Sequence, residues 1–239
     1  MKADLPVVYR KCSAFFAAFP YPLSAIRPVL PSTTLVPVTL VPRKGLLIVA
    51  VFDYLDTSIG PYREVGIGFP CRLRTSGPMP LLPLLAERYF PDVGSWVQLL
   101  PVTTPIANDL GRAQWGFPKF VADIRIDRTD DHVECEVTEN GERLLRVEIE
   151  RPGISRSTSL PMRLYSTLDD DLLMTELAID GAGHISKIRP RARLEIASHA
   201  RTRDLDGAAV ANAKPIEVRW FDEYRTMLDR PTIRYRLSA

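Results

Sequence analysis

The stretch that decides the fold runs DIRIDRTDDHVECEVTENGERLLRVEIE, from Asp123 to Glu150. Apolar residues recur in it at every second place, and charged or polar residues fill most of the places between them. Because successive side chains of a strand point to opposite faces, this alternation predicts strands with one face in the core and one in water. Asn140-Gly141 predicts a type I′ hairpin turn between the last two strands. We therefore expect an antiparallel meander with one solvated face.

Further strands are expected on both sides of the meander. Residues 46–55 are apolar on both faces, which is typical of a central strand. A turn at residues 42–45 joins them to a strand at 35–41, and Gly45 would supply the positive φ. The remaining strands are expected at 7–9, 12–19, 62–69, 96–102, 216–220 and 233–237, and between 160 and 197 with breaks at 169–171 and 180–183.

Short helices are expected at 22–27, where Pro28 would end the helix, at 81–89 and at 106–113. No linker, repeat or low-complexity segment divides the chain. The sequence therefore predicts a mainly β (α+β) fold in one domain, residues 1–239.

Charge and hydropathy exclude several classes of function. Lys and Arg number 31 against 29 Asp and Glu, a formal charge of +2, which is too balanced to indicate nucleic-acid binding. The longest apolar run, Leu46 to Phe52, is too short for a bilayer, which needs about 20 residues. The N-terminus lacks the apolar core of a signal peptide. We expect a soluble cytoplasmic protein with no membrane partner.

Cysteine and histidine spacing argues against a metal site. Cys12, Cys71 and Cys135 are far apart and form no Cys-x-x-Cys pair, so they are expected to be small core residues in a reducing compartment. The three histidines are isolated and have no metal-ligand spacing.

The segment Trp115-Gly116-Phe117-Pro118-Lys119-Phe120 sets one lysine among three aromatic residues, and no other lysine has such neighbours. Burying an unpaired ammonium costs several kcal/mol, so a lysine enclosed by apolar groups tends to lose its proton. The neutral amine is a nucleophile towards carbonyl carbon. The simpler alternative is a lysine at the start of a strand that extends past its aromatic neighbours into solvent.

A second candidate residue, Glu64, lies on the strand expected at 62–69. In extended geometry Tyr62, Glu64, Gly66 and Gly68 share one face, and the glycines leave open space beside the carboxylate. The alternative is a glutamate that faces solvent on a half-buried strand.

Two segments resemble the acetoacetate decarboxylase family. Residues 111–119 carry Gly-Arg, a few residues, an aromatic residue, Pro and Lys, like the family's Schiff-base lysine segment. Residues 56–64 resemble the segment that ends in Tyr-x-Glu, whose glutamate faces that lysine. The order and separation of the two segments also fit. By this resemblance the chain is identified as a divergent member of the family. The resemblance implies a closed, cone-like antiparallel β-barrel and a homo-oligomer.

The departures from the family pattern concern the substrate carboxylate. The family follows its reactive lysine with a second lysine, where this chain has Phe120. The family's arginine ahead of the first short helix aligns near Pro20, and no arginine lies between Arg10 and Arg27. A further family glutamate aligns with the apolar residues 49–51. These differences weaken the case for decarboxylation and leave iminium chemistry intact.

The resemblance implies that Lys119 attacks a ketone or small oxo acid and forms an iminium ion. The iminium would act as electron sink for loss of carbon dioxide, aldol chemistry or dehydration, while Glu64 moves protons. No metal or organic cofactor is needed. Substrate contacts are expected from Tyr62, Trp115, Phe117, Phe120 and Arg112.

Two alternatives remain open at this stage. The aromatic residues around Lys119 would also serve as plain core residues, and Arg112 as a structural one. The alternative function is a non-catalytic oligomer that binds a small ligand in the cavity of the fold.

Overall fold

The computed structural model describes residues 5–31, 34–74, 91–153 and 155–236, and most of them lie in strands. The helix expected at 81–89 lies outside the described residues. The strands are β1 Val7–Pro22, β2 Leu35–Pro37, β3 Lys44–Thr57, β4 Tyr62–Leu73, β5 Val93–Val102, β6 Lys119–Val121, β7 Asp123–Arg128, β8 His132–Glu139, β9 Glu142–Glu150, β10 Ser155–Leu168, β11 Asp171–Ser186, β12 Ala192–Ile196, β13 Glu217–Leu228 and β14 Ile233–Arg236. The helices are α1 Leu23–Ile26, α3 Pro105–Trp115 and α4 Gly207–Ala211, with 3-10 turns η1 Arg27–Val29 and η4 Ala200–Thr202.

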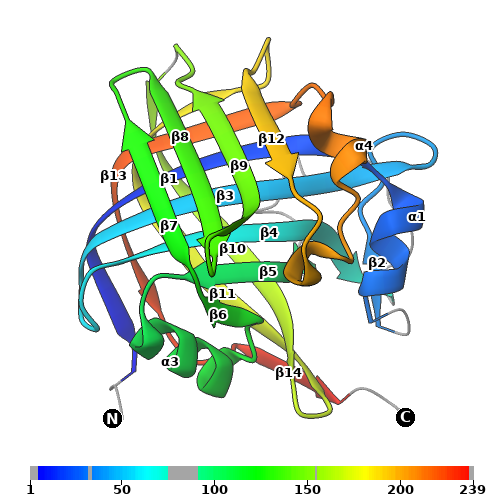
Figure 1. The fold of residues 1–239 in the computed structure, drawn as a ribbon. Helices are drawn as coiled ribbons and strands as arrows, with labels where there is room; N and C mark the ends of the chain where they lie inside the picture. Colours follow the sequence, from blue (N-terminus) through cyan, green and yellow to red (C-terminus); the bar gives the residue numbers. More distant parts are fainter. Residues whose placement is uncertain (1–4, 32–33, 75–90, 154, 237–239) are drawn as a thin grey trace.

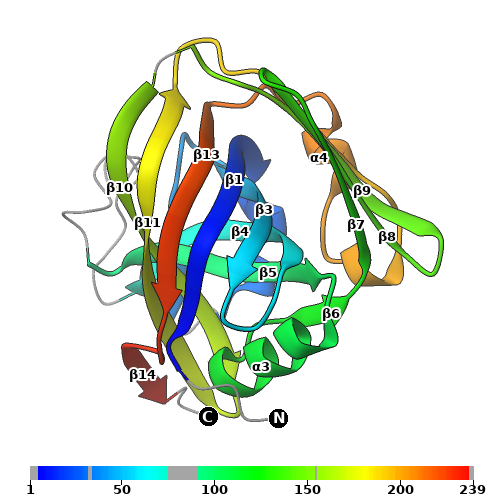
Figure 2. The same cartoon turned by 90° about the vertical axis from the view of Figure 1, so that its left-hand side faces the viewer.

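The larger sheet closes into a barrel (Figures 1 and 2). Its strands follow one another in the order β4-β3-β1-β13-β11-β10-β5, and β5 pairs again with β4 to complete the ring. The predicted barrel is thus confirmed, with one difference. It is mixed rather than purely antiparallel, because β5 runs parallel to β10 and to the short strand β6.

The meander forms a separate four-stranded sheet, in the order β12-β9-β8-β7, that packs on one side of the barrel (Figure 2). The hairpin turn between β8 and β9 is confirmed, because Asn140 and Gly141 have φ of 53° and 83°. Lys119 does not lie in this sheet. It begins β6, which pairs with β5 of the barrel, and the meander starts four residues later at Asp123.

The barrel wall has two buried faces, which accounts for the apolar run in β3. Leu47, Val49 and Val51 face a core layer shared with the meander. Ile48, Ala50 and Phe52 face the inside of the barrel. A strand that is buried on both faces loses the alternation of apolar and polar residues that the meander shows.

Several local expectations are corrected. The positive φ of the 42–45 turn falls on Arg43, at 72°, while Gly45 is already in β3, where a Cβ would meet the Ile26 side chain at 2.8 Å. Pro28 does not end the helical segment, because it lies inside η1. Residues 180–183 do not break the strand: β11 continues through them with one register shift. The strand expected at 35–41 is shorter and pairs with β4 instead of β3.

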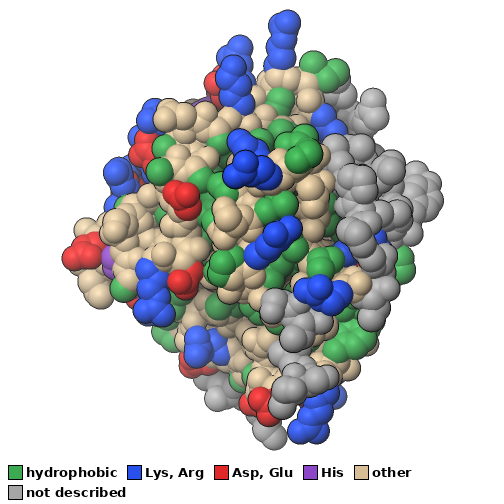
Figure 3. All heavy atoms as spheres, turned by 90° about the vertical axis from the view of Figure 1, so that its right-hand side faces the viewer, with side chains coloured by type: hydrophobic (Ala, Val, Ile, Leu, Met, Phe, Trp, Pro, Cys, Tyr) green, Lys and Arg blue, Asp and Glu red, His purple; other side chains and the backbone are tan. Residues whose placement is uncertain are grey.

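The described surface is mixed in charge. On the face shown in Figure 3, basic and acidic side chains are scattered among apolar and uncharged groups. Across the ranges that the structure describes, no helix has the length and apolar character needed to cross a bilayer.

Candidate active site

The backbone of Lys119 is held by two neighbours. Its strand β6 pairs in parallel with β5, where Leu100 is its Cα partner. Arg112, on the last turns of helix α3, donates a hydrogen bond from Nη1 to the Lys119 carbonyl oxygen at 3.0 Å. The Arg112 side chain therefore holds the Lys119 backbone, which fixes the point from which the lysine side chain extends.

Gly111 makes room for that stem. A Cβ built on Gly111 would lie 2.4 Å from Lys119 Cδ and 2.6 Å from Cε, distances that real side chains do not adopt. Ala is the better residue in a helix by about 1 kcal/mol, so glycine here costs helix stability and is explained by the space that it leaves. The Gly-Arg pair of the sequence motif thus has two physical tasks, clearance and anchoring.

The turn from helix α3 to β6 depends on Gly116. It adopts the left-handed conformation at φ 60°, which ends the helix, and its N–H bonds to the Arg112 carbonyl. A Cβ at this position would also lie 2.1 Å from the Thr167 carbonyl oxygen of β10. Trp115, which we expected beyond the helix, is its last residue.

The Lys119 amine lies next to Glu64. Nζ donates a hydrogen bond to Glu64 Oε2 at 2.6 Å, and the two side chains are only 5% and 9% exposed. Charged residues are almost never buried this deeply without a partner. The amine also lies 5.7 Å from the centre of the Tyr62 ring and 5.9 Å from that of Phe117. Lysine, carboxylate and two aromatic rings therefore converge on one point.

Buried phenols surround the far side of the carboxylate. Tyr54 donates a hydrogen bond to Glu64 Oε1 at 3.3 Å, and the hydroxyls of Tyr9 and Tyr62 lie 2.9 Å apart. Burial raises the pKa of the Tyr54 phenol well above its usual range, and the charge of Glu64 raises it further. The pKa of Tyr9 is raised by the same two causes in the same order. These hydroxyls therefore stay protonated at neutral pH and can donate hydrogen bonds.

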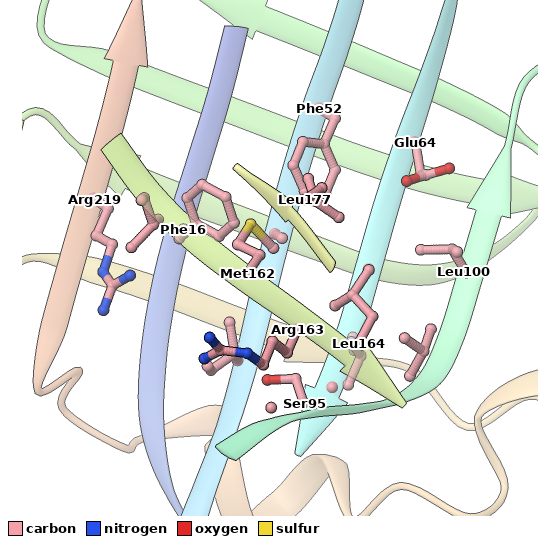
Figure 4. Close-up of a pocket in the computed structure, with 18 of the residues that line it drawn as sticks. Phe16, Phe52, Glu64, Ser95, Leu100, Met162, Arg163, Leu164, Leu177 and Arg219 are labelled. Atoms are coloured by element: carbon pink, nitrogen blue, oxygen red, sulfur yellow. The ribbon is translucent and has the colours of Figure 1, made fainter. Parts of the chain in front are cut away.

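Glu64 and Lys119 line a cavity of about 140 Å³ inside the barrel. Figure 4 shows Glu64 at this cavity. Gly66 and Gly68 line the same cavity, as expected from their place on the Glu64 face of β4. Most of the remaining wall is apolar. It includes Phe16, Phe52, Leu100, Met162, Leu164 and Leu177. A volume of this order admits a small organic molecule, since an apolar cavity of about 150 Å³ binds benzene.

The expected contact residues divide into two groups. Phe117 lines the cavity, and Tyr62 lies under the amine. Trp115 packs behind Phe117, with ring centres 6.1 Å apart, and its indole N–H bonds to the Asp229 carbonyl. Phe120 points to the opposite side of β6, into the layer shared with the meander, where the Arg201 guanidinium lies 4.4 Å from its ring centre. Arg112 has its described contact with the Lys119 backbone.

Sequence reasoning missed the phenols Tyr9 and Tyr54 and the apolar wall from β10 and β11. Tyr54 lies on the same face of β3 as Phe52, and Phe52 is the strand partner of Glu64. Pairing β3 with β4 in this register would therefore have predicted Tyr54 near the carboxylate. The contribution of Met162, Leu164 and Leu177 depends on long-range closure of the barrel, which leaves no local signal.

Cysteine and metal chemistry have no described place at this site. Cys12, Cys71 and Cys135 are all buried and free. Burial raises the pKa of the Cys12 thiol to about 12. Within the described residues, no group of three or more His, Cys, Asp or Glu side chains is arranged to hold a metal ion.

Comparisons with known proteins bear on the family and the fold. The sequence profile of the acetoacetate decarboxylase family matches residues 1–161. No curated protein sequence is similar enough to the chain to count as a match.

Solved structures share the fold at low identity. An acetoacetate decarboxylase from Legionella pneumophila aligns with a TM-score of 0.66 at 14% identity, over 98% of this chain and 93% of its own. The enduracididine biosynthesis enzyme MppR, in complex with pyruvate, gives 0.63 at 13%, over 100% and 92%. An acetoacetate decarboxylase-like enzyme from Sphingomonas wittichii gives 0.55 at 12%, over 99% and 95%. With the profile match covering more than half of its residues, the chain belongs to the acetoacetate decarboxylase family.

Proposed function

We propose that this protein is a carbon–carbon lyase that forms a Schiff base through Lys119 with a ketone or small oxo acid. The observation that carries the proposal is the buried contact of 2.6 Å between Lys119 Nζ and Glu64 Oε2 at a cavity wall. A lysine on a protein surface is strongly hydrated and protonated, whereas this amine is shielded by the barrel and has a carboxylate to exchange its proton with.

The proposed first step needs only these two groups. The pair shares one proton, and when Glu64 holds it the neutral Lys119 amine attacks the carbonyl carbon. The carbinolamine then loses its oxygen as water, with the proton that Glu64 returns, and a positively charged iminium remains beside the Glu64 carboxylate. Atoms and charges balance, because amine, carbonyl compound and carboxylic acid become iminium, carboxylate and water.

The iminium can accept the electron pair of a neighbouring bond that breaks. Loss of carbon dioxide, cleavage between carbons in an aldol sense and loss of a β-hydroxyl as water all use this electron sink. Glu64 is placed to protonate the resulting enamine carbon, or to take a proton from carbon or hydroxyl in the reverse direction. Tyr54, through its hydrogen bond to Oε1, would keep the carboxylate oriented. No organic cofactor or metal is required for this sequence.

The pyruvate in the MppR structure supports a carbonyl substrate for this chain as well, as an analogy between folds. As in the family, we propose that the protein works as a homo-oligomer with residues 1–239 as one domain. A cytoplasmic location is part of the same proposal.

The test is reductive trapping. Incubating the protein with a panel of ketones and oxo acids and reducing with borohydride should add the mass of the reduced substrate to one site, which peptide mapping locates at Lys119. Lys119→Arg should abolish both adduct and turnover while gel filtration shows an unchanged oligomer. Lys44→Arg, at the exposed first residue of β3, is the matched control and should label normally.

The competing function is a ligand-binding oligomer without catalysis. The orientation of Phe120 away from the amine favours it, because the described site has no second lysine where the family carries one. Absence of an adduct with every carbonyl compound between pH 5 and 9 would contradict the Schiff-base proposal and leave the binder.

A further inference from the structure

We propose that the cavity selects a carbonyl compound with uncharged, apolar groups on both sides of the carbonyl, such as an alkyl or aryl-alkyl ketone, over short 2-oxo and 3-oxo acids. This inference rests on the proposed Schiff base at Lys119 and names the class of substrate that this site takes.

The wall around the amine is mainly apolar. Its polar groups include Lys119, Glu64, the hydroxyls of Tyr9 and Tyr54, and Thr226, the β13 partner of Tyr9. Its apolar side chains include Phe52, Leu100 and Phe117. Apolar substituents gain about 25 cal/mol per Å² when such a wall removes them from water, whereas a carboxylate must give up its hydration.

A substrate carboxylate would upset the charge balance at the amine. The lysine charge is already compensated by Glu64 at 2.6 Å. A carboxylate one or two bonds from the iminium carbon would bring a second negative charge into the same buried space. One cation would then face two carboxylates, and like charges at short range in a protein interior are strongly unfavourable.

Arginines also line the cavity. Arg163 and Arg219 lie towards the end away from Glu64 (Figure 4). Arg219 is on β13 and Glu64 on β4, three strand spacings apart in the barrel order, which is about 14 Å along the sheet. The carboxylate carbon of acetoacetate lies only two bonds from the carbonyl carbon, roughly 2.5 Å away, so it cannot reach that end.

Those two arginines are also engaged by carboxylates of the protein. Arg163 Nε lies 2.6 Å from Glu176 Oε1, and Arg219 forms an ion pair with Glu217. Glu217 itself lines the cavity and pairs with Lys187 at 3.1 Å. The far end is therefore a network of both signs, and its charges do not amount to a dedicated anion site.

Selection of a ketone restricts the reactions that the site can carry out. A ketone without a carboxylate cannot lose carbon dioxide, so the routes that remain are aldol cleavage or condensation and loss of a β-hydroxyl. In the cleavage direction the iminium of a β-hydroxy ketone gives up its hydroxyl proton to Glu64, and the carbon–carbon bond breaks. The β-carbon leaves as the carbonyl carbon of an aldehyde or ketone, and the electron pair of the broken bond converts the iminium into an enamine. Protonation of the enamine by Glu64 and hydrolysis by water then release the ketone and restore Lys119.

The experiment compares isosteric pairs on the full chain. 4-Methylpentan-2-one has the skeleton of acetoacetate with two methyl groups in place of the carboxylate oxygens, and 3-methylbutan-2-one matches pyruvate in the same way. Each compound is titrated with borohydride present, and the labelling rate per concentration at Lys119 is read by mass spectrometry. An acetone adduct that forms from acetoacetate counts as labelling by the acid.

We expect each ketone to label Lys119 about 100-fold more efficiently than its isosteric acid, because the acid would bring in a buried carboxylate that has no cation partner. Equal or faster labelling by the acids would overturn the inference and leave the Schiff base standing. Absence of labelling by all four compounds would overturn the proposed function itself, and the inference with it.

A variant gives an independent check. Leu177 lines the cavity and is only partly buried, so it tolerates a charge better than the fully enclosed residues. Leu177→Lys should shift the labelling ratio towards the acids at least about tenfold, because it supplies the missing cation. Leu177→Met is the matched control and should keep the preference for ketones. An unchanged ratio in a folded Leu177→Lys protein would contradict the inference.

Discussion

The two faces of the barrel wall differ in what they bury. The layer between barrel and meander is mainly apolar, and residues such as Phe15, Val51 and Leu145 belong to one buried cluster there. The barrel interior, on the other side of the same strands, holds Lys119 and Glu64 in direct contact together with several phenols. Because a buried ion pair seldom stabilises a fold relative to apolar residues of equal size, the difference supports the proposal that the interior pair serves a reaction while the apolar layer stabilises the fold.

The largest expected effect comes from breaking the buried pair. Glu64→Leu leaves the lysine without its partner and should lower the free energy of unfolding by about 3–5 kcal/mol. The double variant Glu64→Leu with Lys119→Met replaces both charges by apolar groups and should regain most of that loss, or exceed the parent, while forming no adduct. Urea denaturation followed by circular dichroism measures both.

The matched control for this prediction lies in the apolar layer. Leu145→Ala should cost about 2–5 kcal/mol through the cavity that it leaves, with unchanged labelling of Lys119 in the folded fraction. A double variant at Lys119 and Glu64 that is less stable than Glu64→Leu alone would show that the interior pair serves the fold.

The second prediction concerns the clearance under helix α3. Gly111→Ala should leave the fold close to its parent stability, because alanine favours the helix while the flexible lysine side chain moves aside. The displaced amine should lose about 100-fold in the rate of adduct formation, the size of effect that a misplacement of about 1 Å produces. Quenching the trapping reaction at successive times and measuring the adduct by mass spectrometry gives the rate.

Gln114→Ala, on an exposed face of the same helix, is the control and should retain the parent rate. Normal labelling in a folded Gly111→Ala protein would show that the amine has another productive position and that the close contact with Gly111 is not needed.

The third prediction concerns the buried phenols, which do not change the pH dependence of stability near neutral pH. Burial raises the pKa of Tyr9, Tyr54, Tyr62 and Tyr224 above the usual value of 10. Above pH 10 the unfolded chain releases protons that the folded chain retains, so stability is complete below pH 10 and falls as pH rises beyond it. Each fully protected phenol then costs about 1.4 kcal/mol per pH unit.

Absorbance at 295 nm follows the ionisation. These four phenols should ionise together with alkaline unfolding, whereas in the unfolded protein in denaturant all tyrosines should titrate near pH 10. Titration of most of the tyrosine absorbance near pH 10, with circular dichroism unchanged, would contradict the described interior.

The sequence predicted local geometry well where one face meets water. The alternation around Val133, Cys135 and Val137 was enough for the meander, and Asn140-Gly141 for its turn. It could not assign strands to sheets, since alternation reports which face is buried and nothing about the neighbour. The parallel pairing of β6 with β5, which fixes Lys119, is such a long-range fact.

Glycine positions were also misread in the same way. Gly45 and Gly181 looked like turn residues, yet both lie in strands where another segment approaches closely, as the Glu223 carbonyl does at Gly181. For the site, the pairing of Lys119 with Glu64 was expected only through the family resemblance. Neither residue has a neighbour in sequence that reveals the other.

The threading of the Lys119 stem beneath Gly111 has one more consequence. Because the amine is buried at the cavity wall, a ligand must enter the barrel to reach it, and the proposed adduct would stay there until it is hydrolysed. Water released on condensation must leave through the mainly apolar cavity, and water for hydrolysis must return the same way. Passage of ligand and water through the cavity, rather than bond formation at the nitrogen, would then limit the rate of turnover.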